Sequence, residues 1–142
     1  MIHFDNVSKR YASGHTALAE VSFGIDAGEM VFVTGHSGAG KSTLLHLLGA
    51  LDFPSPGEIL SEGRALNLMS RSELADWRNR EVGFIFQAYY LLPELDALEN
   101  VCLPARMARI PAAVAAKRGR ELLEQPEIKS AYLEGGRQQV ES

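Results

Sequence analysis

The chain has 142 residues, of which 46% are hydrophobic and 23% charged, and its formal net charge is −4. This length corresponds to about one domain, and the ordinary composition excludes a disordered, collagen-like or coiled-coil chain. The lysines and arginines form no basic stripe, which argues against nucleic-acid binding, and the single cysteine, Cys102, cannot form an intramolecular disulfide. The chain starts without a signal-peptide pattern and has no apolar run approaching the roughly 18 residues of a membrane span, so we expect any membrane role to act through a partner.

The first third of the chain predicts strands. Residues 2–7 and 21–25 alternate apolar and polar side chains, which is typical of half-buried strands, and residues 12–16 predict a turn between them. Residues 30–34 (MVFVT) form an unbroken apolar run and therefore predict a strand buried on both faces. A glycine-rich loop at 35–40 then leads into a leucine-rich helix predicted over 41–51.

The middle of the chain repeats this alternation of strand and helix. Residues 58–61 predict a short strand, and Ser70 followed by Glu73 indicates a capping box that begins a helix over about 71–80. Residues 82–86 (VGFIF) predict a second fully buried strand.

The remainder is mainly helical. The sequence from Asp96 onward predicts a helix with a break at Pro104, and residues 112–123 predict another. Residues 125–142 are polar and are expected to form a poorly ordered tail.

The sequence GHSGAGKS at 35–42 matches G-x-x-x-x-G-K-[ST] and lies between an apolar strand and a helix, the context that this phosphate-binding loop (P-loop) requires. Glycines let backbone N–H groups approach a phosphate chain closely, and the N-terminus of the following helix adds its dipole. Lys41 is expected to reach the β- and γ-phosphates, Ser42 to bind Mg²⁺, and Thr43 to add a hydroxyl near the α-phosphate. The alternative is a glycine-rich turn that binds nothing.

Three segments, TGHSGAGKSTLL, VSKRY and GFIFQ, give the chain a resemblance to the ATP-binding cassette (ABC) family over most of residues 1–123. The first fifty residues are similar to the cell-division cassette, and GFIFQAYYLLPELDALENVCLP is more similar to the lipoprotein-releasing and macrolide-export cassettes. The resemblance implies an α/β P-loop NTPase fold, namely a truncated ABC-type nucleotide-binding domain with an N-terminal antiparallel β part and a C-terminal helical part. The expected parts are a nucleotide-binding core at 1–94, a partial helical subdomain at 95–124 and the tail at 125–142.

The resemblance also implies roles for individual residues, with ATP and Mg²⁺ as ligands. Tyr11 would stack on the adenine ring, although a tyrosine at a strand end can also serve only in packing. Gln87 would contact Mg²⁺ and the γ-phosphate, the alternative being a polar residue that closes a buried strand. Ser42 and Gln87 are thus the expected metal ligands, and the nucleotide-binding set is Tyr11, Gly35, Ser37, Gly38, Ala39, Gly40, Lys41, Ser42, Thr43 and Gln87.

The expected partner is an integral-membrane permease subunit, which would place the chain in the cytoplasm at the inner face of the plasma membrane. In the family, the region of Gln87, Tyr89 and Tyr90 lines the groove that receives a helix of that subunit, and aromatic anchors often dominate interface energies. Burial of these side chains against the chain's own helical part is the alternative. A cassette homodimer is also possible.

The family's later motifs are missing from this sequence. After Gln87 the only aspartate is Asp96, and no apolar strand ends in Asp-Glu, so no catalytic residue is assigned and hydrolysis is expected to be weak or absent. The segment LEGGRQQV at 133–140 is similar to the family signature, but Glu134 stands where a serine belongs. The same segment also fits the closing residues of another cassette type or a plain polar end of the chain. The alternatives are therefore a non-hydrolysing nucleotide- or partner-binding fragment and a truncated product that does not fold stably; a P-loop kinase fits the context of Tyr11 and Gln87 less well.

Overall fold

The computed structural model of the chain describes residues 1–128. The chain divides into two units, Met1–Phe84 and a second that begins at Ile85. The expected boundary after residue 94 stays a prediction. Most of the polar tail predicted at 125–142 and the whole LEGGRQQV motif at 133–140 lie outside the described residues.

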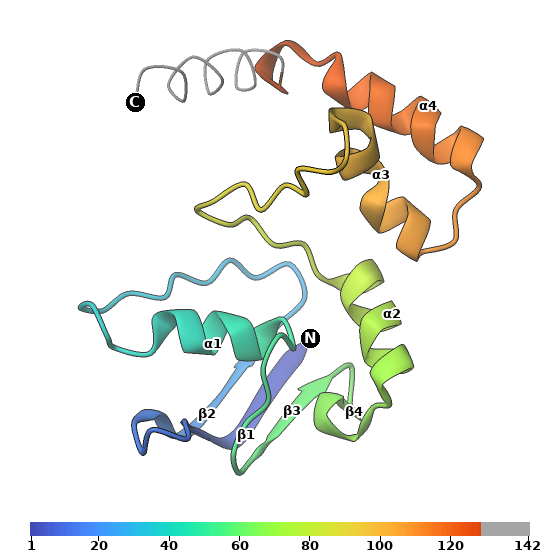
Figure 1. Cartoon of the computed structure of the whole chain (residues 1–142). Coiled ribbons are helices and arrows are strands. Elements are labelled where there is room, and N and C mark those ends of the chain that lie inside the picture. Colours follow the sequence, from blue (N-terminus) through green and yellow to red (C-terminus); the bar gives the residue numbers. More distant parts are fainter. Residues whose placement is uncertain (129–142) are drawn as a thin grey trace. The chain divides into compact units, whose positions relative to one another are not determined.

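An antiparallel sheet forms the base of the first unit (Figure 1). β1 (Ile2–Arg10) lies between β2 (Thr16–Ile25) and β3 (Glu58–Ser61), and β3 pairs in turn with β4 (Arg64–Ala65). All three pairings are antiparallel. The N-terminal antiparallel β part is therefore confirmed, with strands longer than the alternating pattern alone indicated.

β1 departs from regular alternation at its middle. Phe4 and Val7 are both fully buried although they are three residues apart, and residues three apart in a regular strand point to opposite faces. The pairing register with β2 shifts between these two residues, and Asn6 has a positive φ of 48°. This β-bulge returns Val7 to the core side of the sheet.

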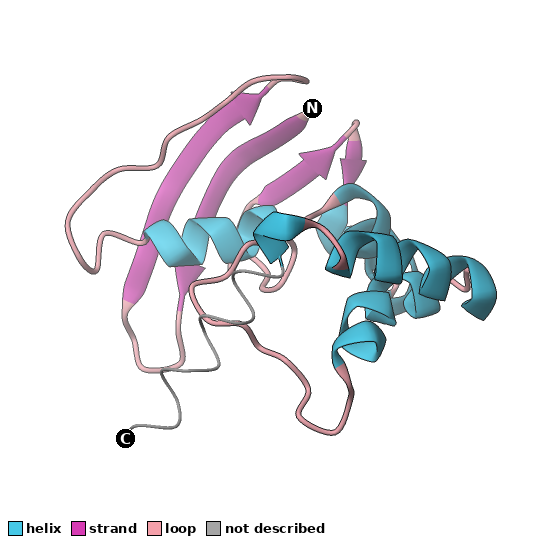
Figure 2. Cartoon of the chain, turned by 90° about the horizontal axis from the view of Figure 1, so that it is seen from above, coloured by secondary structure: helices cyan, strands magenta, loops and turns pink. Residues whose placement is uncertain are grey.

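Helix α1 (Lys41–Leu48) lies across one face of the sheet, as Figure 2 shows. Its Leu47 is fully buried, and the ring of Phe4 stacks on that of Phe23 at 4.6 Å between centroids. The core cluster consists of apolar side chains from the sheet, from α1 and the turn after it, and from the segment after β4: Phe4, Val7, Leu47, Ala50, Ile59, Leu66 and Leu74. The sheet and α1 are thus held together by one small core.

The segment after β4 contains a short 3-10 helix, η1 (Leu66–Leu68), and then α2 (Arg71–Glu81). The predicted capping box at the start of α2 is confirmed, because the Glu73 N–H donates to the Ser70 hydroxyl and the Ser70 N–H donates to the Glu73 carboxylate. Two donors that the helix leaves unsatisfied are thereby paired.

The buried strands predicted at 30–34 and 82–86 are not formed in the described structure, so this prediction is wrong for residues 1–128. Met30 and Phe32 are each 80% exposed, and Ile85 is fully exposed. A strand buried on both faces needs hydrogen-bonding neighbours and apolar cover. The sheet of the described residues, in the order β2-β1-β3-β4, includes neither run.

The second unit contains α3 (Ala97–Met107) and α4 (Ala112–Leu123). Asp96 caps α3 in a capping box with Glu99. The helix passes through Pro104, so the predicted break there is wrong. Proline lacks an N–H donor and its ring crowds the carbonyl four residues earlier, but the helix continues beyond it, because the Pro104 carbonyl accepts from the Ala108 N–H at 3.0 Å.

The two helices of the second unit lie close together at Gly119. A Cβ on this glycine of α4 would come within 2.8 Å of Leu98 Cδ1 and 2.9 Å of Cys102 Sγ, both on α3. The Cys102 thiol also donates to the Ala115 carbonyl at 3.4 Å. No helix described in residues 1–128 is both long and apolar enough to cross a membrane.

Candidate functional site

The P-loop wraps the start of α1 in the way that the sequence predicts. Its glycines adopt conformations that other residues rarely adopt, with φ of 148° at Gly35, 80° at Gly38 and 84° at Gly40. Gly40 is the N-cap of α1, and a Cβ there would lie only 2.4 Å from the carbonyl oxygen of Ala17 in β2. Only glycine therefore fits at this point, where the loop lies against the edge of the sheet.

Lys41 folds back over the P-loop. Its ammonium donates to the carbonyl oxygens of Gly35 at 2.8 Å and His36 at 2.7 Å. A lysine ammonium has three donors, so these two bonds fix its position and leave one donor for a ligand. The positive charge is thus held at the mouth of the loop, beside the N-terminus of α1, and both features favour an anion there.

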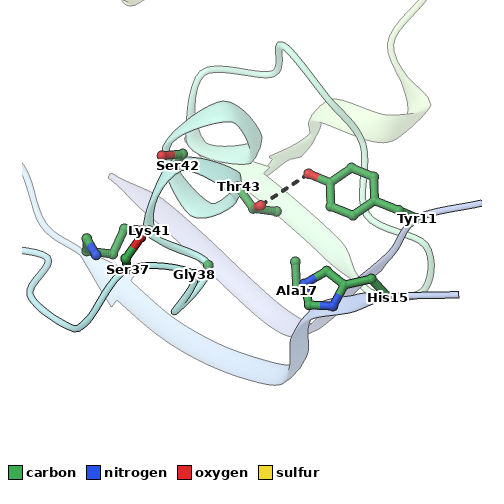
Figure 3. Close-up of a pocket in the computed structure, with 9 residues that line it drawn as sticks. Tyr11, His15, Ala17, Ser37, Gly38, Lys41, Ser42 and Thr43 are labelled. Carbon is green, nitrogen blue, oxygen red and sulfur yellow. Dashed lines mark hydrogen bonds between the residues drawn. The ribbon is translucent and has the colours of Figure 1, made fainter. Parts of the chain in front are cut away.

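A pocket of about 270 Å³ opens beside the P-loop (Figure 3). It lies between the turn that joins β1 to β2 and the start of α1. The residues that line it are Tyr11, His15, Ala17, Ser37, Gly38, Gly40, Lys41, Ser42 and Thr43. The structure therefore brings most of the expected nucleotide-binding set together around one cavity, whereas Gly35 and Ala39 shape the loop without lining it.

Tyr11 is fixed in the pocket by two contacts. Its phenol oxygen lies 3.1 Å from the hydroxyl of the buried Thr43, and the Lys9 ammonium lies over its ring, 5.4 Å from the centroid. Lys9 also donates to the Asp52 carboxylate at 2.5 Å and to the Phe53 carbonyl at 2.8 Å. The side chain of Tyr11 is thereby tied both to α1 and to the loop that follows it.

The ion pair of Lys9 with Asp52 changes the acidity of Asp52. Partial burial raises the pKa of the Asp52 carboxyl, but the hydrogen bonds that it accepts from Lys9 and from the Phe53 N–H outweigh this effect. The pKa of Asp52 is therefore held below its usual range.

Two residues of the pocket, His15 and Ala17, were not expected from the sequence. The turn explains why they lie there, because the Tyr11 N–H donates to the His15 carbonyl at 2.9 Å and brings the two residues opposite each other. A turn predicted between two antiparallel strands was the available indication, since residues at its two ends must be neighbours.

Gln87 lies in the second unit and is exposed. Its expected contact with Mg²⁺ and the γ-phosphate stays a prediction. Tyr89 and Tyr90 follow it with 81% and 74% of their surfaces exposed, and the ring of Tyr90 meets that of Phe86 edge-on at 5.1 Å. The side chains of Tyr89 and Tyr90 are thus not buried against the helices, which was the alternative that the sequence left open.

No group of three or more His, Cys, Asp or Glu side chains among the described residues could hold a metal ion. Of the hydroxyl groups that line the pocket, that of Ser42 at the start of α1 stands at the motif position expected to bind Mg²⁺. One hydroxyl suits Mg²⁺ bound mainly by phosphate oxygens and water, which is how Mg²⁺ is held in nucleotide sites.

A family model described as "ABC transporter" matches residues 18–141. Among curated proteins, an uncharacterized ABC transporter ATP-binding protein of Thermotoga maritima is 48% identical over 129 residues, which cover 87% of this chain and 55% of the relative. The lipoprotein-releasing system ATP-binding protein LolD of Syntrophotalea carbinolica is 44% identical, with 98% of this chain and 65% of the relative covered. LolD of Myxococcus xanthus is 50% identical over 107 residues, which are 75% of this chain and 48% of the relative.

Solved structures of ATP-binding cassettes are also similar to this chain. The ATP-binding cassette MJ0796, in a dimeric post-hydrolysis state bound to ADP and Pi, matches with a TM-score of 0.78 and 38% identity. The match covers 87% of this chain and 56% of MJ0796. The chain therefore spans between about half and two thirds of the length of these relatives.

Proposed function

This chain belongs to the ABC transporter family, and we propose that it binds ATP in the pocket between Tyr11 and the P-loop as part of a transporter's ATP-binding subunit. The family resemblance and the α/β P-loop cassette fold predicted from the sequence are both confirmed. The observation that carries the proposal is the pocket itself, which joins an aromatic ring to a phosphate-binding loop within one unit of the chain.

The residues of this pocket divide the work of binding a nucleotide. The backbone N–H groups of the loop around Gly38 and Gly40 would hold the phosphates, and Lys41 would add its remaining donor and its charge. Tyr11 would stack on the base. Stacking uses the π face of the ring and so has little base selectivity.

Mg²⁺ would complete the phosphate end of the site. The Ser42 hydroxyl would supply one oxygen ligand. The family resemblance implies the same role for the side-chain carbonyl of Gln87. The ion, when bound, neutralises phosphate charge. The role of the chain's own residues is to position the phosphate chain along α1.

The names of the relatives suggest the type of transporter. We propose a lipoprotein-releasing, export or cell-division system, because relatives at 44% and 50% identity are lipoprotein-releasing ATP-binding proteins. The partner would be an integral-membrane permease subunit that contacts the exposed segment at Gln87, Tyr89 and Tyr90 and keeps the chain at the inner face of the membrane. Two cassettes would pair, as in the dimeric structure of MJ0796.

Hydrolysis by these 142 residues alone is expected to be weak or absent. Phosphoryl transfer depends on groups that orient the attacking water and support the metal, and no apolar strand ending in Asp-Glu follows Gln87 in this sequence. A second candidate function is therefore binding of nucleotide without turnover.

Calorimetric titration of the purified chain with Mg-ATP, run beside Lys41→Ala, tests the proposal. The substitution removes a charge-assisted contact worth roughly 1.5–3 kcal/mol, so we expect a ten- to hundredfold loss of affinity. Lys117→Ala is the matched control, since Lys117 is an exposed lysine on α4, outside the pocket. Equal affinities for the parent and Lys41→Ala would contradict the phosphate-binding role of the P-loop.

A further inference from the structure

The pocket has two chemically different ends (Figure 3). Ser37, Lys41 and Ser42 provide hydroxyl groups and an ammonium at one end, whereas the ring of Tyr11 and the imidazole of His15 lie at the other. The polar end suits phosphates. The aromatic end therefore has a second planar side chain beyond the tyrosine that base stacking requires.

His15 is held at this end by the backbone of the turn. The Tyr11 N–H donates to the His15 carbonyl, and the Gly14 N–H donates to the Tyr11 carbonyl, both at 2.9 Å. These two bonds close the turn and leave both side chains lining the same cavity. Because the bonds involve backbone atoms only, the position of residue 15 does not depend on its side chain.

The two side chains differ in how they are tied down. Tyr11 is bonded to Thr43, and one face of its ring is covered by the Lys9 ammonium. A base can therefore stack only on the other face. The imidazole of His15 has no hydrogen-bond or ion-pair partner within residues 1–128, although it lines the same pocket.

We propose that His15 is the second wall of the nucleoside end of the pocket, where its imidazole packs against the base and ribose that Tyr11 holds from the other side. The inference rests on the proposed function, since it needs a nucleotide in this pocket. It adds a residue that contacts the nucleoside and not the phosphates. Its ligand is a nucleoside triphosphate.

Two ligands separate this role from phosphate binding: Mg-ATP and inorganic tripolyphosphate with Mg²⁺, each titrated calorimetrically into the full chain. His15→Ala should weaken ATP about three- to tenfold, which is the size of a lost planar contact, and leave tripolyphosphate unchanged. His15→Phe, which keeps a planar ring, should retain most of the ATP affinity. His3→Ala is the matched control, because His3 is an exposed histidine on β1, outside the pocket.

An unchanged ATP affinity in His15→Ala would overturn the proposal. So would an equal loss for both ligands, which would place His15 at the phosphates, or a loss in His15→Phe as large as in His15→Ala. A parent chain that bound neither ligand would give a different pattern, because the P-loop itself would then have failed and the proposed function with it.

Discussion

Replacement of Gly40 by alanine tests the close approach of the P-loop to the sheet. Gly40 begins α1 with a φ of 84°, and a Cβ at this position would lie 2.4 Å from the Ala17 carbonyl oxygen and 3.1 Å from Leu18 Cδ2. Ordinary van der Waals contact begins at 3.4 Å, so β2 and the start of α1 would have to move apart. The nearest atom is a backbone oxygen, which cannot rotate away as a side chain could.

Two effects add in Gly40→Ala. The left-handed conformation costs an L-residue roughly 1–2 kcal/mol, and crowding of a packed site typically costs about 1–3 kcal/mol more. We therefore expect a loss of about 2–5 kcal/mol in the free energy of unfolding, measured by urea titration with far-UV circular dichroism. Since a small domain is stable by only about 5–15 kcal/mol, the change should be large in that assay.

Gly28→Ala is the control for the backbone effect alone. Gly28 has nearly the same φ, 79°, but a Cβ there would meet nothing within 4 Å. Gly28→Ala should lower the free energy of unfolding by only about 1–2 kcal/mol. If Gly40→Ala were no more destabilising than Gly28→Ala, the contact between the loop and Ala17 would not exist in solution and the described loop geometry would be refuted.

Substitutions at Tyr11 and Asp52 test the surroundings of the pocket. Tyr11→Phe should lower the free energy of unfolding by about 0.5–1.5 kcal/mol through loss of the hydrogen bond to Thr43, yet keep the affinity for nucleotide. Tyr11→Ala should weaken the binding of ATP and of GTP alike. If calorimetry showed unchanged affinity in Tyr11→Ala, Tyr11 would not belong to the site. Because the pKa of Asp52 is lowered in the fold, its ion pair with Lys9 stabilises the folded state at pH values above the unfolded-state pKa of about 4. This contribution to the free energy of unfolding is lost as the pH falls through the folded-state pKa. Urea titrations between pH 7 and about pH 3 should therefore show a smaller acid loss in Asp52→Asn than in the parent, while the exposed Asp5→Asn should follow the parent; parallel curves for Asp52→Asn and the parent would contradict the ion pair's role.

Local patterns predicted the elements whose stabilising partners lie nearby in the sequence. The capping box of Ser70 and Glu73 set the start of α2 correctly, and Asp96 did the same for α3. The conformation of the P-loop could be predicted, because its glycines adopt positive φ through local backbone geometry and Lys41 bonds to carbonyls within the loop. These features depend on contacts within a few residues.

Features that depend on distant neighbours could not be predicted. The runs at 30–34 and 82–86 are apolar enough for buried strands, but hydrophobicity does not supply the neighbouring strands that burial requires. The place of His15 in the pocket depends on how the turn closes, and the burial of both Phe4 and Val7 depends on a bulge. The expected role of Gln87 is a third case, because it comes from the family resemblance and not from a local pattern in the sequence.

The contacts that shape the pocket lie outside the apolar runs at 30–34 and 82–86, although Phe84 packs on Gly49 at the far end of α1. Gly40 lies against Ala17, Tyr11 is bonded to Thr43, and α1 is held by Leu47 in a core formed with β1 and β3. None of these contacts involves residues 30–34 or 82–86. Nucleotide binding should therefore survive in this chain even where turnover does not, because the binding pocket rests on the sheet and α1, whereas phosphoryl transfer needs further groups around the γ-phosphate.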